Sequence, residues 1–134
     1  MRRTITTLLM FEGRAEEAML RYAEIFGDAA IEAIERYGPE GPGPEGTVVH
    51  ATLRLGEQRV QCTDSPVAHA FTFTPATSLM VDCDSEAEVQ RLFEALGQAG
   101  EVLMPLDAYP FSPRFGWVND RFGVSWQLRF VPPA

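Results

Sequence analysis

Hydrophobic residues recur along the chain with two different periods, and these periods predict where helices and strands lie. An apolar residue at every third or fourth position indicates one face of a helix, whereas strict alternation indicates a strand with one buried face. Residues 14–26 and 85–100 have the helical period. Each segment carries Glu in its first turn, and Ser85 with Glu88 predicts a capping box at the start of the second helix.

Strands are predicted around both helices from β-branched and apolar runs. The predicted strands are residues 4–11, 31–37, 48–56, 59–64, 78–83 and 101–110, with a last hairpin that turns at residues 120–123. Pro105 favours an edge or a bulge for its strand, because proline donates no hydrogen bond to a neighbouring strand. Residues 38–46 contain only Gly, Pro and Glu, and we expect a mobile loop there without regular structure.

The order strand, helix and three strands therefore occurs twice. When the chain is slid along itself, residues 8–10 fall on residues 79–81, Glu17 falls on Glu88 and Tyr22 on Phe93. This internal repeat predicts an α+β fold of two tandem βαβββ modules. We expect a single domain over residues 1–134, with modules at 1–64 and 76–134 and a linker at 65–75. The alternative is a chain of two unrelated α+β halves.

Composition excludes several classes of partner. The 134 residues are 46% hydrophobic and 22% charged, which is typical of a globular domain with a real core. A net charge of −8 disfavours nucleic acid and anionic lipid, and no apolar run is long enough to span a bilayer. The N-terminus lacks the apolar stretch of a signal peptide, and two cysteines make no disulfide framework, so we expect a reduced cytoplasmic protein.

Four stretches carry a resemblance to a known family: F-E-G-R-A-E-E-A (11–18), H-A-T-L-R-L-G (50–56), F-T-F-T-P-A-T-S-L-M-V-D-C-D (71–84) and F-G-W-V-N-D-R-F-G-V-S-W-Q-L (115–128). Together they resemble the PhnB-like branch of the vicinal oxygen chelate superfamily, which includes glyoxalases, bleomycin resistance proteins and dioxygenases. The resemblance implies curled sheets around a cleft and a homodimer. Proteins of this branch often carry the label 3-demethylubiquinone 3-methyltransferase, but the chain has no G-x-G-x-G turn for an adenosylmethionine-type methyl donor.

Metal-dependent members of the superfamily hold a divalent ion with inward-facing His and Glu. Gln127 stands where those relatives have a Glu, and an amide is a poor ligand for Zn²⁺ or Fe²⁺. A facial triad would require both histidines, His50 and His69, together with Asp64 or Asp82. We therefore expect no cofactor and no metal ligands, with a divalent metal as the alternative.

Candidate chemistry lies on the polar faces of the predicted strands. His50 is on the polar side of its strand, where it serves as a general base or simply as an exposed or dimer-interface residue. Gln61, Ser125 and Gln127 are expected to face the cleft. The catalytic candidates are His50 and Gln127. Cys62 is either a nucleophile or, as we expect, a small buried residue.

Aromatic residues supply candidate walls for the cleft. Trp117 is placed to stack on a planar ligand, although large aromatics in strands more often belong to the core. Residues 105–116, with Tyr109 and Phe111 among several prolines, predict a stiff aromatic loop that forms a wall, a lid or a dimer interface.

Two functions follow from these observations. The first is a protein that binds or sequesters a small, partly apolar ligand in its cleft. The second is an enzyme, either a metal-dependent lyase, isomerase or dioxygenase acting on a small oxygen-bearing substrate, or the methyltransferase of the family label.

Overall fold

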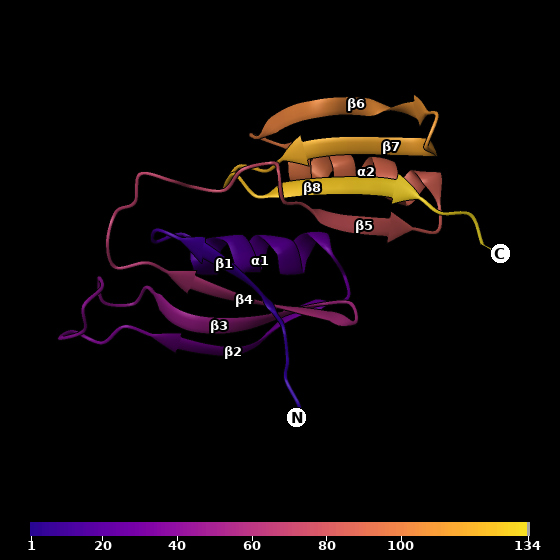
Figure 1. The fold of residues 1–134 in the computed structure, drawn as a ribbon. Coiled ribbons are helices and arrows are strands. Elements are labelled where there is room, and N and C mark those ends of the chain that lie inside the picture. Colours follow the sequence, from indigo (N-terminus) through magenta and orange to yellow (C-terminus); the bar gives the residue numbers. More distant parts are fainter. Residues whose placement is uncertain (134) are drawn as a thin grey trace. The chain divides into compact units, whose positions relative to one another are not determined.

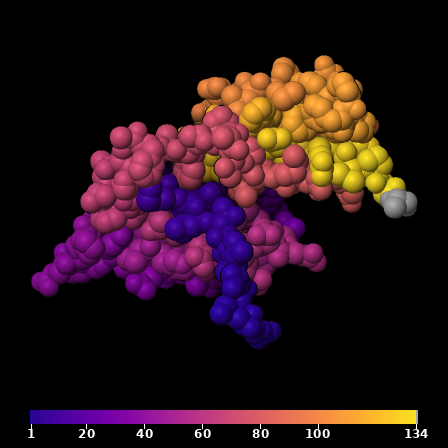
Figure 2. All heavy atoms as spheres, in the orientation of Figure 1, coloured from indigo at the N-terminus to yellow at the C-terminus, as the bar shows by residue number. Residues whose placement is uncertain are grey.

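A computed structural model describes residues 1–133, which form two compact units. The first unit comprises Met1–Ala70 and the second begins at Phe71; each is described by itself (Figure 1). Residues 1–6, which carry the two N-terminal arginines, precede the first strand and form an extended tail (Figure 2). The helices have 11 and 12 residues, and neither is long and apolar enough to cross a bilayer.

The first unit is one four-stranded sheet with a helix on one face. Its elements are β1 (Thr7–Phe11), α1 (Ala15–Ile25), β2 (Ala29–Arg36), β3 (Val48–Leu55) and β4 (Gln58–Asp64). The strand order is β1-β4-β3-β2, with β1 parallel to β4 and the other pairs antiparallel. Because strand side chains alternate, one face of the sheet supplies the core under α1 and the other is free of the helix. The core residues of β3 and β4 include Ala51, Leu53, Val60 and Cys62.

The second unit repeats this arrangement. Its elements are β5 (Leu79–Cys83), α2 (Glu86–Gly97), β6 (Glu101–Tyr109), β7 (Ser112–Asn119) and β8 (Ser125–Phe130). The order is β5-β8-β7-β6, again with one parallel pair, β5 with β8 (Figure 1). The identical topology confirms the α+β class and the two tandem βαβββ modules.

The helix boundaries agree with the prediction to within three residues, but the predicted capping box is only half formed. Ser85 Oγ accepts a hydrogen bond from the backbone N–H of Glu88 over 3.1 Å. The Glu88 carboxylate accepts hydrogen bonds from the Arg91 guanidinium, one helical turn further on. An ion pair at this spacing competes with the capping role of the glutamate.

The prediction of a stiff aromatic loop at residues 105–116 is wrong. These residues belong to the antiparallel strands β6 and β7, and only Pro110 and Phe111 separate them. The prolines are tolerated because Pro105 lies on an edge strand where the pairing shifts between Met104 and Asp107, and Pro113 precedes the first pair of β7 with β8. The edge or bulge predicted at Pro105 is confirmed.

The Gly- and Pro-rich segment 38–46 contains no helix or strand, as predicted. Its ends are joined by backbone hydrogen bonds from Gly46 N–H to the Tyr37 carbonyl (2.9 Å) and from Tyr37 N–H to the Thr47 carbonyl (2.8 Å). Gly43 lies so close to the Tyr37 ring that a Cβ there would come within 2.8 Å of it. The loop therefore folds back over this tyrosine.

Candidate functional site

The second sheet has one face covered by α2 and one face that α2 leaves free. Gly116 lies against the Phe93 ring of the helix, and Val118 lies beside Gly97 at its end. Strand alternation and the pairing of β7 with β8 then assign Trp117, Ser125 and Gln127 to the opposite face. We call this the open face, and it comprises Ser78, Met80, Asp82, Phe115, Trp117, Asn119, Ser125, Gln127 and Arg129.

A chain of hydrogen bonds joins four side chains on the open face. The indole N–H of Trp117 donates to Ser125 Oγ over 2.8 Å. The hydroxyls of Ser125 and Ser78 are 2.6 Å apart, and the Gln127 amide donates to Ser78 Oγ over 3.2 Å. Two of the predicted ligand-binding residues, Trp117 and Ser125, and the catalytic candidate Gln127 are therefore brought together.

Ser78 and Asn119 are members of this site that sequence reasoning missed. The pairing of Leu79 with Trp126 in the parallel β5–β8 ladder brings Ser78 beside Ser125, and nothing in the local sequence signals this contact. Asn119 lies directly across from Ser125. Its side-chain oxygen is buried and accepts no hydrogen bond from any described residue. An unpaired buried carbonyl is costly and points to a missing partner.

Three aromatic rings cluster at the β6–β7 hairpin. Phe115 is buried, and the rings of Tyr109 and Phe111 meet it edge-on with centroids 5.7 Å and 4.9 Å away. Tyr109 and Phe111 stack on each other at 5.5 Å, while Phe111 stays largely exposed. Phe115 precedes Trp117 by two positions on β7, so both belong to the open face. The predicted wall residues thus form a hairpin cluster rather than a loop.

His50 and Gln61 lie in the first unit, on the face of its sheet that α1 leaves free. Thr52 pairs with Gln61 across β3 and β4, and the neighbouring Ala51 and Cys62 point into the core. His50 is exposed on β3 and pairs with Glu35 of β2. The prediction that His50 lies on the polar face of its strand is confirmed.

Both cysteines are buried and reduced. Burial raises the pKa of the Cys62 thiol to about 12, and the nearby Asp64 carboxylate adds to this. Burial and neighbouring carboxylates likewise raise the pKa of Cys83 to about 11. A thiol that stays protonated is a poor nucleophile, so Cys62 serves as a core residue.

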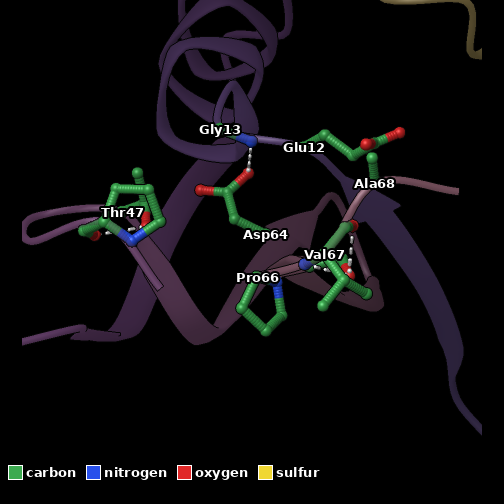
Figure 3. Close-up of a pocket in the computed structure, with 9 residues that line it drawn as sticks. Glu12, Gly13, Thr47, Asp64, Pro66, Val67 and Ala68 are labelled. Atoms are coloured by element: carbon green, nitrogen blue, oxygen red, sulfur yellow. Dashed lines mark hydrogen bonds between the residues drawn. The ribbon is translucent and has the colours of Figure 1, made fainter. Parts of the chain in front are cut away.

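A cavity of about 190 Å³ lies in the first unit, beside the N-terminus of α1 (Figure 3). It is lined by Glu12, Gly13, Pro44, Thr47, Asp64, Ser65, Pro66, Val67 and Ala68. The buried Asp64 carboxylate accepts hydrogen bonds from the backbone N–H groups of Gly13 (2.8 Å), Ala15 (3.0 Å) and Val48 (2.9 Å). Asp64 therefore caps the N-terminus of α1 and hydrogen-bonds the start of β3. None of the residues predicted as catalytic or ligand-binding lines this cavity.

The residues suggested for a metal triad do not fit that role. Asp64 is saturated by backbone donors, and the Asp82 carboxylate forms an ion pair with Arg129 at 2.6 Å. His69 Nε2 lies 2.7 Å from Ser65 Oγ. Within residues 1–133 no three His, Cys, Asp or Glu side chains are grouped so that they would hold a metal ion.

Within the described residues the fold also lacks the usual binding site for a methyl donor of the adenosylmethionine type. Such a group sits over a Gly-rich turn between parallel strands of a doubly wound sheet. In the described residues each sheet has a single parallel pair, and its remaining pairs are antiparallel. The label of the family is therefore not matched by a donor site in this fold.

Comparison with known proteins supports the fold over nearly the whole chain. The PhnB protein from Bacillus cereus is 55% identical, with a TM-score of 0.93 over 96% of this chain and all of that one. A protein from Pseudomonas aeruginosa is 31% identical, with a TM-score of 0.85 over 98% of this chain and all of that one. A glyoxalase-related enzyme from Fulvimarina pelagi is 19% identical and has the same fold, with a TM-score of 0.61 over 96% and 89% of the two chains.

Curated relatives match over a shorter stretch. An uncharacterised protein of Mycobacterium bovis is 31% identical over 96 residues, which is 65% of this chain and 61% of that protein. The match therefore spans less than two thirds of that relative's length.

The family assignment rests on the longest match. The sequence pattern of the 3-demethylubiquinone-9 3-methyltransferase family matches residues 3–129. The chain belongs to this PhnB-like family and has the fold of glyoxalase-related proteins.

Proposed function

We propose that the chain binds a small, partly apolar molecule on the open face of its second sheet. The observation that carries this proposal is the hydrogen-bonded chain of Trp117, Ser125, Ser78 and Gln127 next to an aromatic cluster. Ligand sites typically combine a few oriented polar groups with apolar walls. Ser125, the first residue of β8, is buried within this chain of hydrogen bonds.

The predicted residues divide into two roles on this face. Ser125 and Gln127 orient the polar end of the ligand, directly or through Ser78. Trp117, Tyr109 and Phe111 offer ring faces and edges to its apolar part. Gln61 and His50 are proposed as a separate polar group on the free face of the first sheet.

A second candidate is an enzyme in which His50 moves a proton. Its support is the exposed imidazole of His50 on β3, since an imidazole can accept a proton at one ring nitrogen and donate one from the other. His50→Ala separates the two candidates. If the protein only binds its ligand, the variant keeps the ligand affinity and neither wild type nor variant shows turnover. If the protein is an enzyme, the variant keeps the affinity and loses the turnover of the wild type.

We propose that ligand binding requires no divalent metal. Of the two acids suggested as metal ligands, Asp64 already accepts backbone hydrogen bonds and Asp82 already forms an ion pair with Arg129. Elemental analysis of untagged protein prepared without chelator, with a thermal-shift series in Zn²⁺, Ni²⁺, Mn²⁺ and Fe²⁺, tests this. The expected result is sub-stoichiometric metal and a melting temperature that the ions do not raise. Stoichiometric metal with a large stabilisation would overturn it and favour a Lewis-acid enzyme.

We further propose a homodimer in the cytoplasm. The dimer is supported by the family resemblance, and the compartment by two unpaired cysteines. A net charge of −8 supports a small-molecule ligand rather than nucleic acid. Light scattering during gel filtration gives the oligomeric mass, and a monomer at micromolar concentration would contradict the dimer.

The ligand proposal is tested by a fragment screen monitored by protein NMR. Flat aromatic fragments are expected to perturb the signals of Ser78, Trp117, Ser125 and Gln127. Gln127→Ala should weaken the hits about tenfold, through loss of an oriented hydrogen bond to a buried partner. Gln90→Ala on the outer side of α2 is the matched control and should change nothing; equal affinities in both variants would exclude the site.

A further inference from the structure

Some hydrogen-bond donors and acceptors on the open face have no partner among the described residues. These unused groups indicate the chemistry of the ligand that would bind them. Trp117 Nε1–H is only a donor, so Ser125 Oγ must accept there. Ser78 Oγ accepts from the Gln127 amide. Whichever serine donates in the Ser78–Ser125 contact, the other retains one hydroxyl proton that no described residue accepts.

Acceptors are left over on the same face. Asn119 Oδ1 is buried without a donor, although Asn119 lies across from Ser125 in the β7–β8 ladder. The side-chain oxygen of Gln127, two residues from Ser125 on β8, also has no donor among the bonds it forms to described residues. The open face therefore offers one spare hydroxyl proton, on Ser78 or Ser125, and a buried acceptor across from Ser125.

From this balance we propose that the group bound at Asn119 is uncharged and both donates and accepts hydrogen bonds: a hydroxyl or a primary carboxamide. Its N–H or O–H donates to Asn119 Oδ1, and its oxygen accepts the spare serine proton. This inference rests on the proposed function and names the chemistry of the ligand's polar end.

A charged end is disfavoured by the surroundings. The Asp82–Arg129 ion pair on the same face is internally neutral, and Arg129 donates two hydrogen bonds to that carboxylate. A carboxylate ligand would meet the Asn119 oxygen acceptor to acceptor, and Arg129, the one cation among the open-face residues, is already paired with Asp82. The neighbouring wall is the Trp117 ring, whose indole N–H already donates to Ser125 Oγ over 2.8 Å.

Five aryl probes of similar size test the proposal. Benzamide and benzyl alcohol donate and accept; N,N-dimethylbenzamide and benzyl methyl ether only accept; benzoate accepts and is charged. Affinities are measured by NMR titration of the Trp117 and Ser125 signals. We expect benzamide and benzyl alcohol to bind at least about tenfold tighter than their methylated partners, because a methylated probe leaves one buried acceptor unpaired. Both should also bind tighter than benzoate.

Two variants locate the effect. Asn119→Ala should remove the preference for benzamide over dimethylbenzamide, and Ser78→Ala should weaken both members of the pair. Thr63→Ala, on the first unit, is the control and should preserve the preference.

The outcomes separate this inference from the proposed function. Equal binding of the methylated and unmethylated probes on the open face would overturn the hydrogen-bond assignment and leave a ligand site. Stronger binding of benzoate would also overturn it, because it would mean that Asn119 presents its N–H. Failure of every probe to reach the open face would overturn both proposals.

Discussion

The Trp126 indole N–H donates a buried hydrogen bond to Asp120 Oδ2 over 2.9 Å. The other carboxylate oxygen of Asp120 accepts from the backbone N–H groups of Phe122 and Val124. One acid therefore closes the β7–β8 turn and orients the largest core side chain of the second unit. The two tryptophans have different roles: Trp126 belongs to the core, and Trp117 belongs to the open face.

Asp120→Asn should destabilise the protein by about 2 kcal/mol, because an amide cannot accept on both sides and leaves a buried donor unpaired. Urea denaturation followed by Trp fluorescence measures the change. Glu57→Gln, the same acid-to-amide change in an exposed turn, should leave the unfolding midpoint in place. Equal stability of the two variants would contradict the role given to Asp120.

Asp64→Asn should loosen the start of α1 in the same way. Its carboxylate satisfies backbone donors of Gly13, Ala15 and Val48, and the amide form loses at least one of these bonds. Hydrogen exchange of the amides at Ala15 and Val48 should accelerate about tenfold or more, whereas amides in α2 keep their rates. Unchanged protection at Ala15 would mean that the cap contributes little. Glu12→Gln, one residue before Gly13, is the control.

Gly116→Ala should cost about 1–3 kcal/mol through overpacking against α2. A Cβ at this position would overlap the Phe93 ring, with Cε2 at 2.7 Å. Phe93→Leu in the same chain should recover part of the loss, because it shortens the obstructing side chain. Gly38→Ala, where a Cβ would meet no atom within 4 Å, should be neutral. A loss that Phe93→Leu fails to reduce would contradict this contact.

The Cys62 thiol should make stability depend on alkaline pH. Its pKa is raised from 9.0 to about 12 by burial, so the native state holds the proton more tightly than the unfolded chain. The stabilisation is complete below pH 9 and is lost as pH rises towards 12. Urea midpoints of wild type and Cys62→Ala should therefore differ most near pH 7, where the smaller side chain costs about 1 kcal/mol, and converge above pH 9. A gap that widens with pH would contradict the buried thiol.

Periodicity predicted the elements and their faces well, because the alternating strands and the two amphipathic helices each bury one side. The faces of His50 and Gln127 followed from that alternation alone. The strand at residues 101–110 was predicted, but the start of β7 within residues 111–116 was missed, because local proline content was weighed above the pairing of β6 with β7, which only tertiary structure supplies. Ser78 and Asn119 escaped notice for a related reason: their significance comes from neighbours on other strands and from an unpaired oxygen.

The central claim, that a ligand binds the open face of the second sheet, is tested most directly by fluorine NMR of protein labelled with 5-fluorotryptophan. The chain has two tryptophans, so each gives one signal, and Trp117→Phe assigns them. Titration with benzamide should shift the Trp117 signal in a saturable manner and leave the buried Trp126 signal in place. A Trp117 signal that does not move at saturating benzamide, or a shift confined to Trp126, would contradict the account.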